Sequence, residues 1–562
     1  MSIAERYFPG GAKHVGIVML DGAIDMYANL LRYVSYDLRR HGIRVTLMGC
    51  ASGLKACTSL RSHFQGKRLE SREIADICGR CQAAQRDLET EDRRHLKPGL
   101  AREDEQFLQQ IEAELRRSDT LLSVFDWKAG ADSICKTAFF DFSVGNKVNV
   151  SSRLNAEQKA GFLEIVSDLL LLRAYFEQLA KTANLDAVLY VNGNYSQNQL
   201  ACQVFERYAI PCMSVEPQLT SSSARNALIL IPERLKLNPT ALATVDDRRP
   251  LADGDIERAL EHFFARVVGN EFNAYTTLAG THRSLAAAAE LRHFFARYCD
   301  VRTLFLSSED ELHAHEVVFD DRDSGVRKHS QYEVLQRFLA EAGRNPSLGF
   351  IIRLHPRMAI NKRNHFVAPE HAKYVDLLDH NLPSNVLALH GDCPISSYFL
   401  VSRSSLVIVS WSTIGLEALL LGKPTIALFP EKLMYPVADF NGQPSELDLI
   451  FERVFRENPD IEVRSLRLLN WIVYAYEQQF SPIPVPRATN RRLLSRAYGW
   501  LFNRTKRSGS LGLWYRVDEL AMRVHRRMVG RNASDSMKGL SLDRYRARTA
   551  GLFDRYGKIL GI

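Results

Sequence analysis

Two stretches in the C-terminal half of the chain combine residue types that bind phosphate. The first is the segment 410–418, SWSTIGLEA, which directly follows the apolar run LVIVS. Hydroxyl groups at a helix start, here Ser412 and Thr413, add donors to the free backbone N–H groups, and the helix dipole favours an anion there; Gly415 allows close approach. Ser412 or Thr413 would equally serve as an ordinary N-cap. Alone, this segment leaves both interpretations open.

The second stretch ends the apolar run LGFIIRLHP with Arg353, His355 and Pro356, and Arg357 follows. If this run is a strand of a parallel sheet, these side chains lie at its carboxyl edge, where α/β proteins bind ligands. Two arginines and an imidazole favour a phosphate or a sugar acid, whereas a plain turn at the strand exit is the alternative for a His-Pro pair. Together with segment 410–418, at the end of another strand, they favour a nucleotide site.

Alternating strands and helices would position these residues. The runs HVGIVML, MYANLLRYVSYDLRRHG and IRVTLMG open the chain as strand, helix and strand. A mostly helical, charged insertion covers about 82–182, and a second set of alternations runs from VRTLFLSSED to PTIALFP. We expect an α/β fold with parallel sheets and crossover helices, with domains at 1–280 and 281–480 and a basic helical tail at 487–562.

Four of the nine cysteines have spacing that could hold a metal. Cys50, Cys57, Cys78 and Cys81 form the pattern C-x6-C-x20-C-x2-C, which fits a structural Zn²⁺ site with a closed shell of four thiolates. The first gap is wider than usual, so buried or incidental thiols are the alternative. The segment ELHAHE, with His313 at its centre, is a weaker metal candidate because it lacks the i, i+4 histidine spacing, and we expect a solvated loop there.

The order and spacing of the C-terminal motifs resemble the capsule-polysaccharide-biosynthesis-like family of surface carbohydrate proteins. The residues that carry this resemblance are Phe305–Glu311, Gln331, Ile352–Pro356, Ile395–Tyr398, Ser412–Ala418 and Gly422–Pro424. The pairing of His-Pro with Ser/Thr also resembles capsular Kdo transferases and bacterial sialyltransferases. The resemblance implies the GT-B architecture, two Rossmann-like domains facing a cleft, and a donor that is commonly a CMP-activated sugar.

The resemblance also implies roles for individual residues. His355 would contact the nucleotide phosphate or support the leaving group, and Ser412 and Thr413 would bind phosphate. Glu417 would contact the ribose, although a structural ion pair with Lys423 or Arg403 is an alternative. The expected nucleotide-binding set is Arg353, His355, Pro356, Ser412, Thr413, Gly415 and Glu417.

Sugar transfer also needs a base for the acceptor hydroxyl, and in this architecture it comes from the N-terminal domain across the cleft. Asp21 and Asp25 follow the first strand in a glycine-containing loop, and Glu216 ends a later strand. Asp21 is the preferred base, with Asp25 and Glu216 behind it, and each could instead be a helix cap or turn residue. With His355, Asp21 and Asp25 make up the expected catalytic set.

These observations favour a glycosyltransferase that moves a sugar from a nucleotide-activated donor to a capsule, O-antigen or exopolysaccharide acceptor without a catalytic metal. In this scheme residues 1–280 form the acceptor-side domain and residues 281–480 bind the nucleotide sugar. A sugar-nucleotide epimerase or polyol-phosphate transferase of the same fold is the second interpretation. A non-catalytic polysaccharide-assembly protein is the third.

Charge is concentrated in the tail. Residues 487–562 hold 18 Lys/Arg and 5 Asp/Glu, a net of +13, whereas the whole chain carries +8. Aromatic residues lie among these cations, as in segments that bind anionic membrane surfaces, while solvated helices are the alternative. No apolar run in the sequence is long enough to cross a bilayer, and no recognition module for nucleic acid is present. We therefore expect a cytoplasmic protein that is peripheral at the inner membrane face. Its acceptor would be lipid-linked or a polysaccharide.

Overall fold

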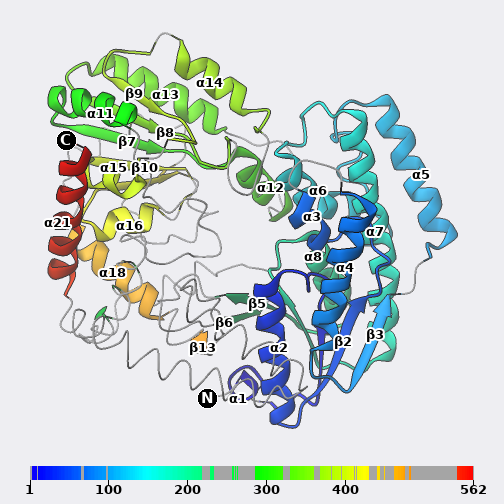
Figure 1. Ribbon diagram of the computed structural model, residues 1–562. Coiled ribbons are helices and arrows are strands. Elements are labelled where there is room, and N and C mark those ends of the chain that lie inside the picture. Colours follow the sequence, from blue (N-terminus) through cyan, green and yellow to red (C-terminus); the bar gives the residue numbers. More distant parts are fainter. Residues whose placement is uncertain are drawn as a thin grey trace.

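The structure is a computed structural model in which the main described segments form two α/β domains (Figure 1). The described residues are 3–8, 10–64, 69–96, 99–217, 228–232, 285–319, 330–359, 367–380, 382–393, 395–410, 414–428, 440–442, 461–474, 480–481 and 541–560, with the single positions 256, 257, 260, 263, 412 and 449.

The N-terminal domain is built on a seven-stranded sheet with the order β13-β6-β5-β4-β1-β2-β3. Its strands are β1 (His14–Val18), β2 (Arg44–Cys50), β3 (Asp92–Leu96), β4 (Ala187–Val191), β5 (Cys212–Pro217), β6 (Leu228–Pro232) and β13 (Phe480–Ser481). The helices are α1 (Ile3–Tyr7), α2 (Asp25–Arg40), α3 (Thr58–Phe64), α4 (Ser71–Arg86), α5 (Arg102–Arg117), α6 (Ile134–Asn146), α7 (Ala156–Thr182) and α8 (Ser196–Arg207). The five strands β1 to β5 pair in parallel, as the strand-helix alternation predicted, and β6 and β13 add an antiparallel edge.

The C-terminal domain has a six-stranded, all-parallel sheet with the order β12-β11-β10-β7-β8-β9. Its strands are β7 (Val301–Phe305), β8 (Gly349–Arg353), β9 (Val386–Leu389), β10 (Leu406–Val409), β11 (Thr425–Leu428) and β12 (Phe440–Gly442). The helices are α11 (Leu285–Arg297), α12 (Glu309–Phe319), α13 (Gln331–Arg344), α14 (His371–Asp379), α15 (Ser397–Arg403), α16 (Ile414–Leu420), α18 (Ile461–Tyr474) and α21 (Leu542–Leu560). The predicted fold class, two α/β domains with parallel sheets and crossover helices, is confirmed.

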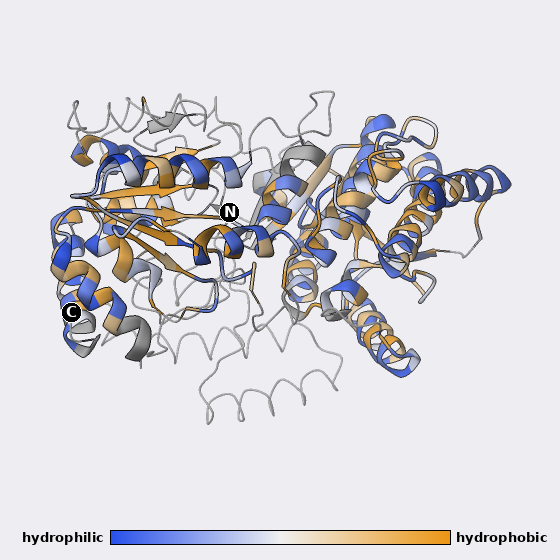
Figure 2. Cartoon of the chain, turned by 90° about the horizontal axis from the view of Figure 1, so that it is seen from above, coloured by the Kyte–Doolittle hydropathy of each residue, from blue (hydrophilic) through white to orange (hydrophobic). Residues whose placement is uncertain are grey.

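Alternation along the buried strands explains why helices cover both faces of each sheet. In β10, Leu406 and Ile408 join the core on one face, whereas Val407 and Val409 join the core on the other. Parallel strands buried on both faces need such continuous apolar runs. Figure 2 shows the strands of this sheet coloured as hydrophobic, between helices whose outer surfaces are hydrophilic.

The last described segments return to both domains. β13 pairs with β6 of the N-terminal sheet, although it lies at the end of the predicted C-terminal domain. α21 packs on the C-terminal domain, where Tyr545 is fully buried and Arg546 donates to the Leu420 carbonyl at 3.1 Å. This part of the predicted basic tail is therefore a structural helix of that domain, and 487–540 lie outside the described residues. None of the described helices is long and apolar enough to span a bilayer.

Candidate functional site

The two predicted phosphate-binding stretches lie at the same edge of the C-terminal sheet. β7 is the neighbour of both β8 and β10, and Phe305 pairs with Arg353 on one side and with Val409 on the other. Two further backbone hydrogen bonds extend these ladders, from Leu306 to Arg353 at 3.1 Å and from Ser410 to Phe305 at 3.2 Å. Because neighbouring strands lie about 4.8 Å apart, the ends of β8 and β10 are separated by roughly 10 Å.

His355 is a half-buried imidazole just beyond the end of β8. Its Nδ1 accepts the backbone N–H of Arg357 at 3.2 Å, so a neutral ring carries its proton on Nε2. Burial lowers the pKa of His355 to about 4, and the neighbouring cations Arg357, Arg353 and Lys147 act in the same direction, while Asp310 opposes them. At neutral pH this ring is therefore an uncharged N–H donor.

The loop that carries His355 is packed closely against the loop that follows β9. A Cβ atom on Gly391 would lie 2.7 Å from the His355 carbonyl oxygen and 3.3 Å from the Pro356 Cα. Real Cβ atoms do not approach backbone so closely, so the absence of a side chain at Gly391 allows this contact. Pro356 contributes here through the path of the backbone.

Arg353 was predicted to bind phosphate, but its guanidinium is engaged by backbone. It is 3% exposed and donates to the carbonyls of His390 at 2.5 Å and Cys393 at 2.7 Å. Alternation along β8 explains this orientation, because Phe350 and Ile352 join the core on one face and leave Arg353 on the face that α15 covers. Arg353 therefore holds the loop between β9 and α15.

The segment after β10 is described in part. Ser412 is half-buried, and its carbonyl accepts the N–H of Gly415 at 3.2 Å. Ser410 is fully buried at the end of β10, and its hydroxyl has no hydrogen-bond partner within the described part of the chain. Thr413 lies outside the described residues.

The remaining members of this segment lie in α16, which is buried along its whole length. Gly415 packs against the sheet, where an added Cβ would lie 3.0 Å from Val409. Glu417 is 1% exposed, so its carboxylate lies inside the domain. Lys423, a predicted alternative partner, is half-buried, and burial together with Arg403 lowers its pKa.

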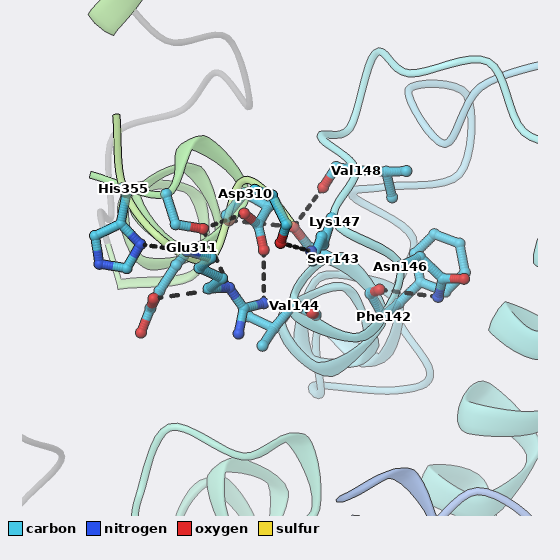
Figure 3. A network of polar contacts seen from close by, with 12 residues as sticks. Phe142, Ser143, Val144, Asn146, Lys147, Val148, Asp310, Glu311 and His355 are labelled. Atoms are coloured by element: carbon cyan, nitrogen blue, oxygen red, sulfur yellow. Dashed lines mark hydrogen bonds and ion pairs between the residues drawn. The ribbon is translucent and has the colours of Figure 1, made fainter. Parts of the chain in front are cut away.

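The two domains meet next to His355, in a polar network that Figure 3 shows. α6 of the N-terminal domain packs against α12 of the C-terminal domain. Arg357 donates to Asp310 Oδ2 at 2.7 Å, to Ser308 Oγ at 3.1 Å and, across the junction, to the Val144 carbonyl at 2.5 Å. Asp310 is 3% exposed, so this is a buried ion pair.

Electrostatics and further contacts strengthen this junction. Burial opposes the charge of Arg357, but Asp310 and Glu311 raise the pKa of its guanidinium above the usual value. Three residues beyond Asp310 along α12, His313 Nε2 accepts the backbone N–H of Val150 at 3.3 Å. The prediction of a solvated loop around His313 is wrong: the segment is helix α12, and His313 is buried at the junction because its ring also packs edge-on against Phe139. His313 was singled out only for its metal-binding residue type.

The predicted base candidates lie at the carboxyl edge of the N-terminal sheet. Asp21 follows β1 and is 1% exposed, and Gly22 beside it packs so closely on α4 that an added Cβ would lie 3.0 Å from the Cys81 carbonyl. The first residue of α2 is Asp25 and the strand β5 contains Glu216, but the side chains of both lie outside the described part of the structure.

The loop after β4 lies at the same edge of the N-terminal sheet. It leads into α8, which contacts α6 at the junction between the domains. Asn192 adopts a left-handed conformation with φ of 56°, and its side-chain Nδ2 donates to the Tyr27 hydroxyl at 3.3 Å. At the start of α8, the Ser196 N–H donates to Asp141 Oδ2 at 2.8 Å. Because Asp141 also pairs with Arg61 of α3, α6 is fixed to both flanking helices.

The four cysteines of the predicted zinc site lie beside this edge. Cys57, Cys78 and Cys81 pack around a small apolar cluster that includes Ile77, and Cys50 packs against a larger core. Burial raises the pKa of Cys81 to about 11, with Asp21 contributing, and burial also raises the pKa values of Cys50 and Cys57. Among the described residues, no three His, Cys, Asp or Glu side chains form a group that could hold a metal ion. The zinc site stays a prediction.

Sequence reasoning missed the partners that fix His355. Arg357 was noted beside the His-Pro pair and Asp310 within the family resemblance, but nothing in the linear sequence joined them to each other or to Val144 and Lys147 of the N-terminal domain. The signal that could have found them is Lys147, a buried cation that directly follows the largely apolar helix α6.

The chain is similar to known proteins only in comparisons with solved structures. No protein-family model and no curated protein matches the sequence. The chain is similar to the KpsC β-Kdo 2,4 transferase of Thermosulfurimonas dismutans, with 15% identity, 51% of this chain and 79% of that chain covered, and a TM-score of 0.30. It is also similar to the UDP-GlcNAc 2-epimerase of Methanocaldococcus jannaschii, with 11% identity, 82% and 98% covered, and a TM-score of 0.27. For MurG of Acinetobacter baumannii the corresponding values are 11%, 82%, 94% and 0.26. At these scores the likenesses carry no argument about reaction or substrate, and the architecture described above rests on the sheet topology of this chain.

Proposed function

We propose that this protein is a glycosyltransferase that moves a sugar from a nucleotide-activated donor to a surface-polysaccharide acceptor. One observation carries the proposal: the ends of β8 and β10, with His355 and Ser412, lie at the same carboxyl edge, two strands apart. Open α/β sheets bind ligands at this edge, and a nucleotide phosphate fits the donors found there.

The chemistry follows from those donors. In transfer, the bond between the anomeric carbon and the phosphate oxygen breaks, and that carbon bonds to the acceptor oxygen, so negative charge moves onto the departing nucleotide. His355 Nε2–H and the hydroxyls of Ser410 and Ser412 would stabilise this charge with preorganised hydrogen bonds. The acceptor hydroxyl loses its proton to a carboxylate of the N-terminal domain, for which Asp21 is the candidate.

Four features of the proposal go beyond the site itself. A CMP-sugar is the favoured donor because of the resemblance of the His-Pro and Ser/Thr motifs. The acceptor would be lipid-linked or a growing polysaccharide, and the cations of 487–540 would hold the protein at an anionic membrane surface. A structural zinc ion on Cys50, Cys57, Cys78 and Cys81 remains part of the proposal.

A thermal-shift panel with CMP, CDP, UDP and GDP tests the site directly, since a ligand that binds only the folded protein raises its Tm. We expect one nucleotide to stabilise the protein selectively and His355→Ala to remove the shift. His380→Ala is the matched control, because His380 is an exposed histidine at the end of α14. No shift with any nucleotide would refute the proposed site.

Product analysis then separates the enzyme classes. With the corresponding nucleotide sugar, a transferase consumes donor only when an acceptor is present, whereas an epimerase changes the sugar without one. A non-catalytic assembly protein would keep its cellular function after His355→Ala and Ser412→Ala, and that outcome would overturn the catalytic proposal.

A further inference from the structure

The carboxyl end of α6 belongs to the N-terminal domain, but it contacts the loop that carries His355. Ser143 Oγ donates to the Asp310 carbonyl at 3.3 Å, and the Val144 carbonyl accepts from Arg357. One turn later, Lys147 Nζ lies 3.5 Å from the Ala359 carbonyl. Figure 3 shows Ser143, Val144 and Lys147 at the end of α6, beside Asp310 of the C-terminal domain. The segment 355–359 is therefore held from both domains.

Lys147 occupies a position that is unfavourable for lysine in two respects. It ends α6 in a left-handed conformation with φ of 54°, where glycine is the usual residue and any other costs about 1 kcal/mol. Its side chain is fully buried, and a buried ammonium group must be compensated by polar partners. Asp310 and the Ala359 carbonyl supply this compensation at the junction. This conformation therefore directs an ammonium group toward the His355 loop.

Four charged groups from three elements act on the His355 ring. Arg353 and Arg357 belong to the same segment of chain, Asp310 belongs to α12, and Lys147 ends α6. Burial is the main reason why the pKa of His355 is lowered, and the three cations add to this effect while the one anion opposes it. Lys147 is the member of this set that comes from the other domain.

We propose that Lys147 is a positioning residue for His355: its buried ammonium group fixes the 355–359 loop, which carries the imidazole N–H donor, from the N-terminal domain. The reaction that this donor serves is the one proposed above, and only in that respect does this inference rest on the proposed function. The placement and charge of the ring are properties of the free protein. They can be measured without a substrate.

Histidine ring NMR of the full chain tests this inference. His355 is assigned by the signal that His355→Gln removes, and its titration is followed in the parent protein and in Lys147→Met, which keeps the apolar stem. We expect the pKa of His355 to rise in Lys147→Met, because one of the cations that lower it is lost. Lys128→Met, at an exposed lysine of the same domain, should leave the titration unchanged.

A second variant covers the case in which Lys147→Met does not fold. Lys147→Gly removes the ammonium group but suits the left-handed backbone, so it should fold and show the same rise in the pKa of His355. An unchanged His355 titration in a folded Lys147 variant would overturn the inference.

Kinetics give a second readout if the proposed transfer is found. Loss of Lys147 should lower kcat more than it raises KM for the donor, and Lys147→Arg should restore part of the loss. Absence of any transferase activity would refute the proposed function, while the titration would still decide the role of Lys147.

Discussion

Substitution of Asp310 by asparagine would leave the Arg357 guanidinium buried beside a neutral side chain. In the parent protein Arg357 Nη2 lies 2.7 Å from Asp310 Oδ2, and their side chains are 16% and 2% exposed. The next carboxylate, on Glu311, is 4.0 Å away and considerably more exposed. Removing one partner of a buried pair typically costs about 3–5 kcal/mol, because the other charge is left uncompensated. We therefore expect Asp310→Asn to lose stability on this scale.

Urea unfolding followed by circular dichroism and by hydrogen exchange of α6 and α12 measures this loss. Glu112→Gln is the control, because Glu112 pairs with Arg116 on the exposed surface of α5 and such pairs contribute about 0.5 kcal/mol or less. The double variant Asp310→Asn/Arg357→Met leaves neither charge, so its loss should be smaller than the sum of the two single losses. A loss below about 1 kcal/mol in Asp310→Asn would refute the buried ion pair described here.

Three further outcomes are expected. The contribution of His355 to stability should be constant above pH 6.5 and should fall as pH drops from 6.5 toward 4, by roughly 3 kcal/mol, because unfolded His355 takes up a proton that the folded ring resists. His355→Gln should lose this part of the slope in acid titrations followed by urea unfolding. Gly391→Ala should displace the His355 loop and abolish the nucleotide-induced Tm shift. Gly343→Ala, whose added Cβ meets no atom within 4 Å, should keep the Tm shift. A normal Tm shift in Gly391→Ala would contradict the close packing. Elemental analysis of protein purified with a reductant should find one zinc per chain that Cys81→Ser removes, and metal-free parent protein would end the zinc proposal.

Much of the fold could be predicted because its strands carry a direct signal. Buried parallel strands such as AVLYV and LVIV are continuous apolar runs, and the helices between them have a clear period. β3 has no such signal: its sequence DRRHL is mostly charged and exposed, so the edge of the sheet fell within the predicted helical insertion. β13 depends on antiparallel pairing with a strand far away in the sequence.

The candidate site could be predicted as a location but not as a set of contacts. The sequence placed His355 and Ser412 at the ends of two strands, and parallel strands bring their carboxyl ends to the same edge of a sheet. The direction of Arg353 depends on which face of the sheet α15 covers, and the sequence does not show this. The role of Arg357 depends on contacts with α6 and α12, which are distant in sequence.

The last described segments complete both domains. The N-terminal sheet includes β13, which follows the C-terminal domain in the sequence, and the C-terminal domain includes α21 from the end of the chain. A protein cut between the two sheets would lose β13 from the first and expose the edge of β6, where unpaired backbone groups invite association with other chains. A protein shortened before α21 would uncover the apolar residues around Phe399 and Leu420. Neither half is therefore a self-sufficient folding unit, and exchange of one domain between relatives would have to carry both returning segments with it.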